Sequence, residues 1–169
     1  MKKPAKIFLV LLSSVLLLAG VIGATGCMFT DDSGNVKSYA VNKTVTFAKA
    51  KYTVTEVKRS ADLNNIAAPE DYEYLTITVK IENTVNSRMT FNQLNWRYVD
   101  ANYIERSCLN DAQYQTPTSM GAGAIMSKNA APFVSTISFL VKKGENGIIN
   151  FYFSADSLVA GFAIDLDKK

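Results

Sequence analysis

The chain has 169 residues, of which 48% are hydrophobic and 20% are charged, with a formal net charge of +3 and no histidine. The lack of histidine excludes Ser-His-Asp and Cys-His triads and the common histidine-containing zinc sites. Lys2, Lys3 and Lys6 account for the whole excess of basic over acidic residues, so the rest of the chain is formally neutral. A neutral domain has no electrostatic footprint for nucleic acid, and we expect no nucleic-acid partner.

The first 26 residues have the pattern of an export signal. Lysines precede an uncharged run, residues 7–26, that is rich in Leu, Val and Ile, which is the order of a basic region followed by an apolar region. The run ends in the small residues 23–26 and reaches Cys27 before the first acidic residue. This stretch resembles the lipobox of bacterial lipoproteins, in which a small residue precedes a cysteine that is lipidated and becomes the first residue after cleavage.

The resemblance implies a signal peptide at residues 1–26, a lipid on Cys27 and a location on the outer face of the bacterial cell membrane. Gly26 fits the position before the cysteine, whereas Ala24 stands where that family prefers Leu or Val. Two other interpretations remain open. One is an uncleaved anchor, because a run of about 20 residues at 1.5 Å each can span a bilayer; the other is a secretory signal cut near Ala24. All three export residues 31–169.

A short polar segment follows Cys27. Residues 28–40, MFTDDSGNVKSYA, include glycine and several polar residues, a composition typical of a linker. We therefore expect residues 27–40 to be a tether. Asp31 and Asp32 lack the alternating ligand spacing and the distal glutamate of a calcium loop, so we expect no metal site and no cofactor.

Cys108 is the other cysteine of the chain. If Cys27 carries lipid, Cys108 has no partner for an intramolecular disulfide. A nucleophilic thiolate needs a basic partner, and the chain has no histidine. We expect Cys108 to be a small buried apolar group.

From residue 41 onward, apolar residues recur with the period of two that is typical of β-strands. In YLTITVKIENT the residues Leu75, Ile77, Val79 and Ile81 alternate with polar ones, which predicts one face in a core and the other in water. In the earlier segments KTVTF and KYTVTEVKR, Val and Thr are frequent, as strands prefer. A change of parity in the second segment predicts a bulge near Thr55.

Later segments predict further strands. NWRYVDANYIER predicts a hairpin with a turn at DAN, and its Trp96 is expected in the core. FVSTISFLVKKG and IINFYFS are separated by turn-forming residues, so we expect them to form a hairpin. GFAIDLD predicts the last strand. The apolar residues expected to face the core in the two segments of the second hairpin are Phe133, Ile137, Phe139, Val141, Ile149, Phe151 and Phe153.

Seven or eight short strands, with no convincing helix after the signal segment, favour an all-β fold. We predict an antiparallel immunoglobulin-like β-sandwich over residues 41–169, preceded by an N-terminal signal helix. The cysteine and tryptophan pattern of antibody domains is absent. A domain of this length can bury a sufficient core without disulfides.

Four segments carry a family resemblance. They are VNKTVTFAKAKYTVTEVKRS, YEYLTITVKIENTVNSRMTF, NWRYVDANYIE and STISFLVKKGENGIINFYF. Together they are similar to the uncharacterised telokin-like domain of many bacterial surface lipoproteins, a family related in fold to a secreted immunoprotective antigen. Ala101 and Asn102 stand where that family usually has a glycine. The resemblance implies a fold, but the family has no agreed activity to carry over, and fold alone implies no function.

Binding specificity in a sandwich resides in its loops. The longest predicted connection runs from Arg106 to Lys128, and ADLNNIAAPEDYEY is the second. Tyrosine is enriched at recognition surfaces, although it also packs routinely on sheet faces. The tyrosines in or beside these loops that form our candidate binding surface are Tyr72, Tyr74, Tyr103 and Tyr114.

Two functions follow from these patterns. The favoured one is an exported, membrane-anchored lipoprotein whose non-catalytic domain binds a protein, peptide or envelope polymer through an exposed tyrosine-rich or apolar patch. The alternative is an envelope hydrolase that uses paired carboxylates, for which Glu70, Asp71 and Glu73 are candidates. A solvated acidic turn at the start of a strand explains these three residues better, because boundaries between strands and loops are normally polar, so we expect no facing carboxyl pair and no enzyme activity.

Overall fold

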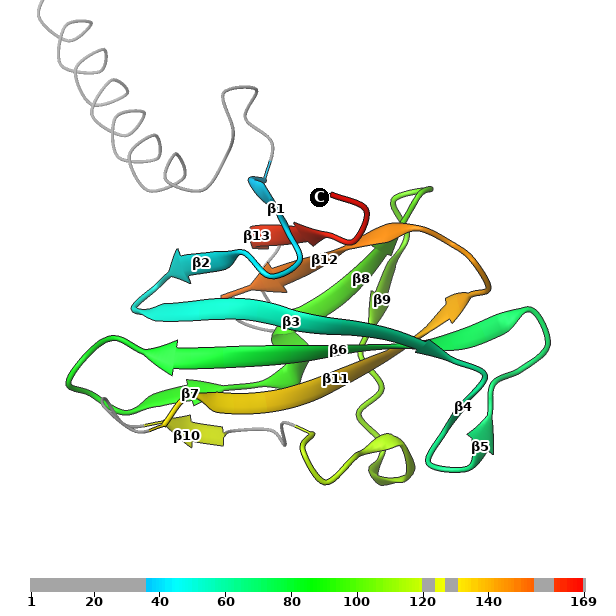
Figure 1. Cartoon of the computed structure of the whole chain (residues 1–169), viewed down its shortest axis with the longest axis horizontal. Coiled ribbons are helices and arrows are strands. Elements are labelled where there is room, and N and C mark those ends of the chain that lie inside the picture. Colours follow the sequence, from blue (N-terminus) through cyan, green and yellow to red (C-terminus); the bar gives the residue numbers. More distant parts are fainter. Residues whose placement is uncertain (1–35, 120–123, 127–130, 154–159, 169) are drawn as a thin grey trace, which may run out of the picture. The chain divides into compact units, whose positions relative to one another are not determined.

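The computed structural model describes residues 36–119, 124–126, 131–153 and 160–168. These residues form thirteen strands and two short 3-10 helices (Figure 1). The strands are β1 (Ser38–Ala40), β2 (Thr44–Phe47), β3 (Ala50–Ser60), β4 (Asp62–Leu63), β5 (Ile66–Ala67), β6 (Tyr72–Asn83), β7 (Met89–Phe91), β8 (Trp96–Asp100), β9 (Glu105–Ser107), β10 (Ala124–Met126), β11 (Phe133–Lys142), β12 (Gly147–Tyr152) and β13 (Ala160–Asp165). The 3-10 helices are η1 (Gln93–Asn95) and η2 (Ala112–Tyr114).

The N-terminal predictions fall largely outside this part of the chain. Residues 1–26, predicted as a signal peptide with a signal helix, and Cys27 lie outside the described residues. Within the described residues, no helix is both long enough and apolar enough to cross a membrane. β1 begins at Ser38, inside the range 27–40 predicted as a tether, so the folded part starts earlier than predicted.

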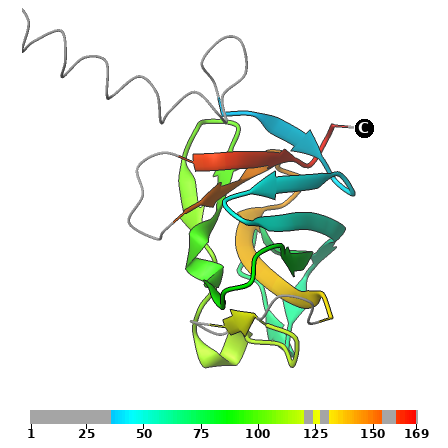
Figure 2. The ribbon, with the colours of Figure 1, turned by 90° about the vertical axis from the view of Figure 1, so that its left-hand side faces the viewer.

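Two main sheets pack as layers around the core (Figure 2). One has the strand order β11-β6-β3-β2 and the other the order β1-β13-β12-β8-β9, while β10-β7 and β4-β5 form two small sheets. The all-β prediction is confirmed. The predicted count of seven or eight strands was too low, and the sheets are not wholly antiparallel because β1 pairs with β13 in parallel. Alternation reports which face of a strand is buried, but it contains no information on strand direction.

The four-stranded sheet follows the predicted alternation. Leu75, Ile77, Val79 and Ile81 are fully buried on the inner face of β6. The register of β3 against β6 shifts between Val54 and Glu56, which confirms the bulge predicted near Thr55. Ile137, Phe139 and Val141 on the neighbouring β11 are buried as predicted. The inner face of this sheet is therefore a continuous apolar layer.

Aromatic rings from both sheets fill one part of the core. Phe151 and Phe162 stack at 5.0 Å between ring centroids, and Trp96 meets Phe151 edge-on at 4.9 Å. Trp96 is buried, as predicted. Such pairs each contribute about 0.5–1.5 kcal/mol beyond the burial of their area. Gly161 on β13 is part of this arrangement, because a Cβ there would lie 2.3 Å from the ring of Phe47.

The predicted hairpin between β11 and β12 was wrong. β11 pairs with β6 in the four-stranded sheet, whereas β12 pairs with β8 and β13 in the five-stranded sheet. The connection crosses from one sheet to the other. Arg59 Nη2 donates to the carbonyl oxygen of Glu145 at 2.6 Å, and the Tyr98 hydroxyl donates to the same oxygen at 3.2 Å. Side chains from both sheets therefore hold this crossover.

The side chain of Phe153 also departs from its prediction. Alternation placed it with Ile149 and Phe151 on the buried face, but Phe153 is 69% exposed. β12 ends at Tyr152, and its register with β13 shifts between Phe151 and Tyr152. Because the shift breaks the period of two, Tyr152 is buried and Phe153 is exposed.

Candidate binding surface

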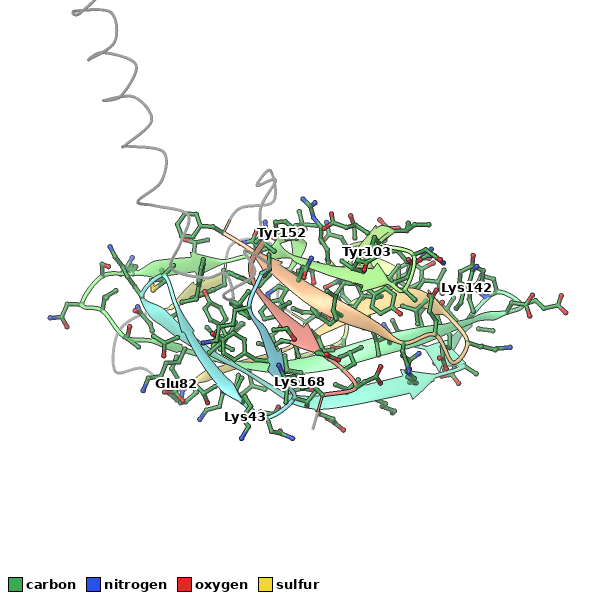
Figure 3. The ribbon with its side chains drawn as sticks, turned by 90° about the horizontal axis from the view of Figure 1, so that it is seen from above. Lys43, Glu82, Tyr103, Lys142, Tyr152 and Lys168 are labelled. Carbon is green, nitrogen blue, oxygen red and sulfur yellow. The ribbon has the colours of Figure 1, made fainter. Side chains whose placement is uncertain are left out.

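The four predicted tyrosines do not form one surface. Tyr103 is 88% exposed on the connection between β8 and β9. Tyr74 is buried, and its ring lies 6.1 Å from that of Tyr114 between centroids. Tyr72 is half-buried at the start of β6. In Figure 3, Tyr103 lies on the side of the molecule opposite Lys43 and Glu82.

The Tyr103 turn, residues 100–104, is fixed by hydrogen bonds to Asp100. The Tyr103 N–H donates to the Asp100 carbonyl oxygen at 2.9 Å, and the Asp100 N–H donates to the Ile104 carbonyl oxygen at 3.1 Å. Asp100 Oδ1 also accepts the N–H groups of Asn102 and Ile104, each at 2.9 Å. Tight turns commonly contain an aspartate whose side chain accepts hydrogen bonds from backbone N–H groups a few residues later in the chain. The turn therefore presents Tyr103 from a defined backbone.

The Asp100 carboxylate is held in its ionised form. The hydrogen bond from the Ile104 N–H is the main cause that lowers its pKa below the usual value; the Asn102 N–H and Arg106 lower the pKa further, while burial acts in the opposite direction. Arg106 Nη2 lies 3.3 Å from Asp100 Oδ2. A charged carboxylate makes stronger hydrogen bonds to N–H groups than a neutral acceptor does.

Tyr103 stands in a conformation that bulky residues rarely adopt. Its φ is +62°, in the left-handed region, where a side chain with a Cβ is strained by about 1 kcal/mol or more. The adjacent Ile104 is 54% exposed. A shallow apolar hollow of about 190 Å³ lies against the turn. It is lined by Val99, Asp100, Ala101, Tyr103, Gly147 and Ile148.

Sequence reasoning found Tyr103 but missed its apolar neighbour. Ile104 follows directly after the predicted turn, and an apolar residue at a turn next to a tyrosine was the available signal. The hollow involves Gly147 and Ile148 at the start of β12. Its position depends on the pairing of β12 with β8, which the sequence pattern did not predict.

The long connection after β9 covers the other sheet. We call residues 108–119, which follow β9, the covering segment. The Leu109 N–H donates to the Ser138 carbonyl oxygen at 2.8 Å, and the Thr136 N–H donates to the Thr118 carbonyl oxygen at 3.0 Å. These bonds occupy the free edge of β11, and Tyr114 covers Tyr74 on the outer face of β6. Burial raises the pKa of Tyr74, as expected for a covered hydroxyl.

A polar hollow of about 360 Å³ lies beside the covering segment on the outer face of the four-stranded sheet. Thr116 Oγ1 lies 2.5 Å from Thr136 Oγ1, and Thr118 Oγ1 lies 3.2 Å from the same atom. Asn64 Nδ2, on the β4–β5 turn, donates to the carbonyl oxygens of Gln113 and Gln115 at 3.0 and 2.8 Å. Because these polar groups already bond to one another, they fasten the covering segment to the sheet.

The acidic residues proposed for hydrolysis lie in different environments. Glu70 and Asp71 are exposed at the start of β6. Glu73 Oε1 lies 2.5 Å from Arg59 Nη1 and accepts the Gly144 N–H at 2.9 Å. Partial burial raises the pKa of Glu73, but the bonds from Gly144 and Arg59 outweigh this effect and hold it below the usual value. Glu73 is therefore an ionised partner of Arg59.

Cys108 is buried beside η1. Its thiol donates to the Gln93 carbonyl oxygen at 3.3 Å, and burial raises its pKa to about 11. A thiol with so high a pKa is a poor nucleophile at neutral pH, in agreement with the expected packing role. In the described ranges, no group of three or more Cys, Asp or Glu residues has the arrangement of a metal site.

Comparison with known proteins places this domain in a family. A family model described as "Domain of unknown function (DUF4352)" matches residues 39–164. A search of curated proteins finds no match.

Solved structures share the fold at low sequence identity. A Bacillus subtilis protein named a putative lipoprotein (YcdA) is 15% identical over 75% of this chain, with a TM-score of 0.56, and this chain spans only 39% of its length. The YjhA protein of Bacillus subtilis is 15% identical with a TM-score of 0.60, covering 76% of this chain and 99% of its own. The secreted protein MPT63 of Mycobacterium tuberculosis is 13% identical with a TM-score of 0.57, covering 76% and 95%.

Proposed function

This chain belongs to the DUF4352 family of domains of unknown function, and on that premise we propose that it is an exported lipoprotein. Residues 1–26 are its signal peptide, Cys27 carries the lipid, and a telokin-like, immunoglobulin-like sandwich stands on the outer face of the bacterial cell membrane. The lipobox-like pattern before Cys27 supports this proposal, as do the names of two proteins of the same fold, one a putative lipoprotein and one secreted.

The sandwich has a binding role in this proposal. The observation that carries it is Tyr103, 88% exposed beside the 54% exposed Ile104 on a turn that Asp100 fixes. Neighbouring apolar side chains displayed at a loop tip are typical of interaction sites. A tyrosine on a fixed backbone loses little conformational entropy when it is covered. We propose that Tyr103 and Ile104 anchor a protein, peptide or envelope polymer.

The hydrolase alternative has no specific observation in its favour. A general acid in glycoside hydrolysis needs a raised pKa. Of the three candidate residues, Glu73 has its pKa lowered by the hydrogen bonds from Gly144 and Arg59, whereas Glu70 and Asp71 are exposed to solvent. We therefore propose a non-enzymatic role.

Site-specific crosslinking in living cells tests the binding role. A photoreactive phenylalanine replaces Tyr103 in one variant and Asn86, an exposed residue between β6 and β7, in a control variant. We expect a discrete crosslinked product from position 103, lost when Ile104→Asp is added, and no product of the same mass from position 86. Equal labelling from both positions, or a product that survives Ile104→Asp, would contradict a binding site at the Tyr103 turn.

Intact-mass spectrometry tests the anchor. The protein extracted from its native membrane is compared with a Cys27→Ala variant. We expect a chain that begins at Cys27 with added acyl mass, and the loss of both features in the variant. An unmodified chain that retains residues 1–26 would instead establish an uncleaved anchor, and a chain cut near Ala24 would establish release.

A further inference from the structure

A third cavity reaches between the two main sheets. Its volume is about 210 Å³, and it shares no lining residue with the hollow beside the Tyr103 turn. Both sheets contribute to its wall, which includes Tyr52 of β3 and Phe151 of β12. Phe91, Met89 and the exposed Phe153 supply most of the remaining apolar wall, and Ala48, Thr90 and Asn95 complete the lining. This volume is below the range of drug-sized pockets, about 300–1,000 Å³, and suits a single substituted ring.

Tyr52 contributes a hydroxyl group to this wall, and its ring is tightly packed among other aromatic rings. The side chain is 3% exposed, and its ring centroid lies 4.8 Å from that of Phe151 and 5.8 Å from that of Phe91. Trp96 and Phe162 pack against the same ring at 6.1 and 5.4 Å. With aromatic neighbours on several sides, the position of the Tyr52 hydroxyl is fixed.

The Tyr52 hydroxyl has no hydrogen-bond partner in the part of the chain that the structure describes. Burial raises the pKa of Tyr52 far above neutral pH, so the hydroxyl keeps its proton and can donate. A tyrosine hydroxyl on the wall of an open cavity takes its partner from water or from a ligand. A ligand that enters this cavity is therefore favoured if it brings a hydrogen-bonding atom.

We infer that this cavity is a binding site for small aromatic alcohols. The ring of such a ligand packs against Phe91, Phe151 and Phe153, and its oxygen accepts the hydrogen bond of the Tyr52 hydroxyl. Aromatic walls favour an aromatic ligand because rings pack edge to face. A hydrocarbon chain would leave the Tyr52 hydroxyl unpaired. A sugar would find few polar partners, because the side-chain amide of Asn95 already donates to the Phe153 carbonyl oxygen.

Nuclear magnetic resonance on the full chain in lipid nanodiscs tests the inference. Methionine methyl groups are labelled, and the Met89 signal, identified with Met89→Leu, reports directly on the cavity wall. The probes are p-cresol and toluene, which differ by one hydroxyl, titrated at matched free concentrations in the aqueous phase. We expect p-cresol to bind about tenfold more tightly than toluene, the size of effect expected for one buried hydrogen bond.

Tyr52→Phe is the decisive variant because it keeps the ring and removes only the hydroxyl. We expect it to bind the two probes with equal affinity while the signals of the other methionines stay in place. No response of Met89 to p-cresol up to 10 mM, equal binding of the two probes to the unaltered protein, or a preference that survives Tyr52→Phe would overturn the inference. Tyr103→Ala should leave the p-cresol preference unchanged, so this test succeeds or fails separately from the proposed function.

Discussion

Two neighbouring connections differ in whether their tyrosine side chains are exposed or packed against a sheet. The Tyr103 turn is short and exposes Tyr103 almost completely, whereas the covering segment is long and packs Tyr114 against the buried Tyr74. By its length, the long connection was expected to be either functional or simply flexible. The structure shows that the described part of this connection pairs with β11 and covers β6, and that the short turn carries the exposed side chains.

Hydrogen bonding explains the difference. The Tyr103 turn satisfies its backbone groups internally through Asp100, so its side chains are free to face solvent. The covering segment bonds instead to Ser138 and Thr136 at the edge of the four-stranded sheet. An uncovered edge strand can pair with another chain, and native proteins often shield such edges with a loop. The long connection therefore protects an edge over its described part.

Replacing Tyr74 should have the largest effect. Tyr74→Ala removes a buried ring and leaves Tyr114 without its packing partner, so we expect the free energy of unfolding to fall by about 3 kcal/mol. Tyr103→Ala should change it by less than about 0.5 kcal/mol because the side chain is exposed. Urea unfolding of both variants measures the contrast. Similar losses for the two would mean that the tyrosines are not divided between packing and display.

Removing one edge hydrogen bond should have the next largest effect. Leu109→Pro deletes the N–H that donates to the Ser138 carbonyl oxygen, and we expect a loss of about 2 kcal/mol because that oxygen is left unpaired. The exposed edge should also promote self-association, visible in sedimentation. Leu109→Ala is the matched control, since it shortens the side chain but keeps the N–H. If both variants lose equal stability and stay monomeric, the covering segment does not protect β11.

Strand existence and facing could be predicted because burial leaves a period of two in the sequence. From Leu75 to Ile81, alternation identified which side chains are buried. In β3, a change of parity identified the bulge near Thr55. The β8–β9 hairpin was also predicted correctly, because its turn residues lie next to the strands that they join. These features are local, and local pattern was sufficient to identify them.

Features that depend on distant partners could not be predicted. Nothing within the segments of β11 and β12 shows that a turn-like connection crosses between sheets. Phe153 was misplaced because the register shift in β12 depends on its pairing with β13. Tyr74 looked like a surface residue because its cover, Tyr114, comes from a connection forty residues away in the chain. In each case a non-local contact overrides the local pattern.

A smaller effect of opposite sign should follow from relieving the backbone at position 103. Tyr103→Asn places a residue that tolerates positive φ at the position with φ +62°. We expect the free energy of unfolding to rise by about 1 kcal/mol. Binding of the partner that depends on Tyr103 should be lost at the same time. Calorimetric unfolding measures the first effect. An unchanged or lower stability would indicate that the turn is not strained, and that the exposure of Tyr103 carries no conformational cost.

Asp100→Asn should have the smallest effect at neutral pH, because the amide oxygen can still accept from Ile104 or Asn102. The difference in the free energy of unfolding between the unaltered protein and Asp100→Asn should depend on pH. The pKa of Asp100 is lowered in the folded state by the N–H groups of Ile104 and Asn102, so its charge contributes stability above the unfolded-state pKa of about 3.9, and this contribution is lost as the pH falls through the folded-state pKa. Urea unfolding of both proteins between pH 7 and pH 2.5 should therefore show the two stabilities converging in acid. A constant gap would mean that the charge on Asp100 does not hold the turn, and that its rigidity comes from the pairing of β8 with β9 alone.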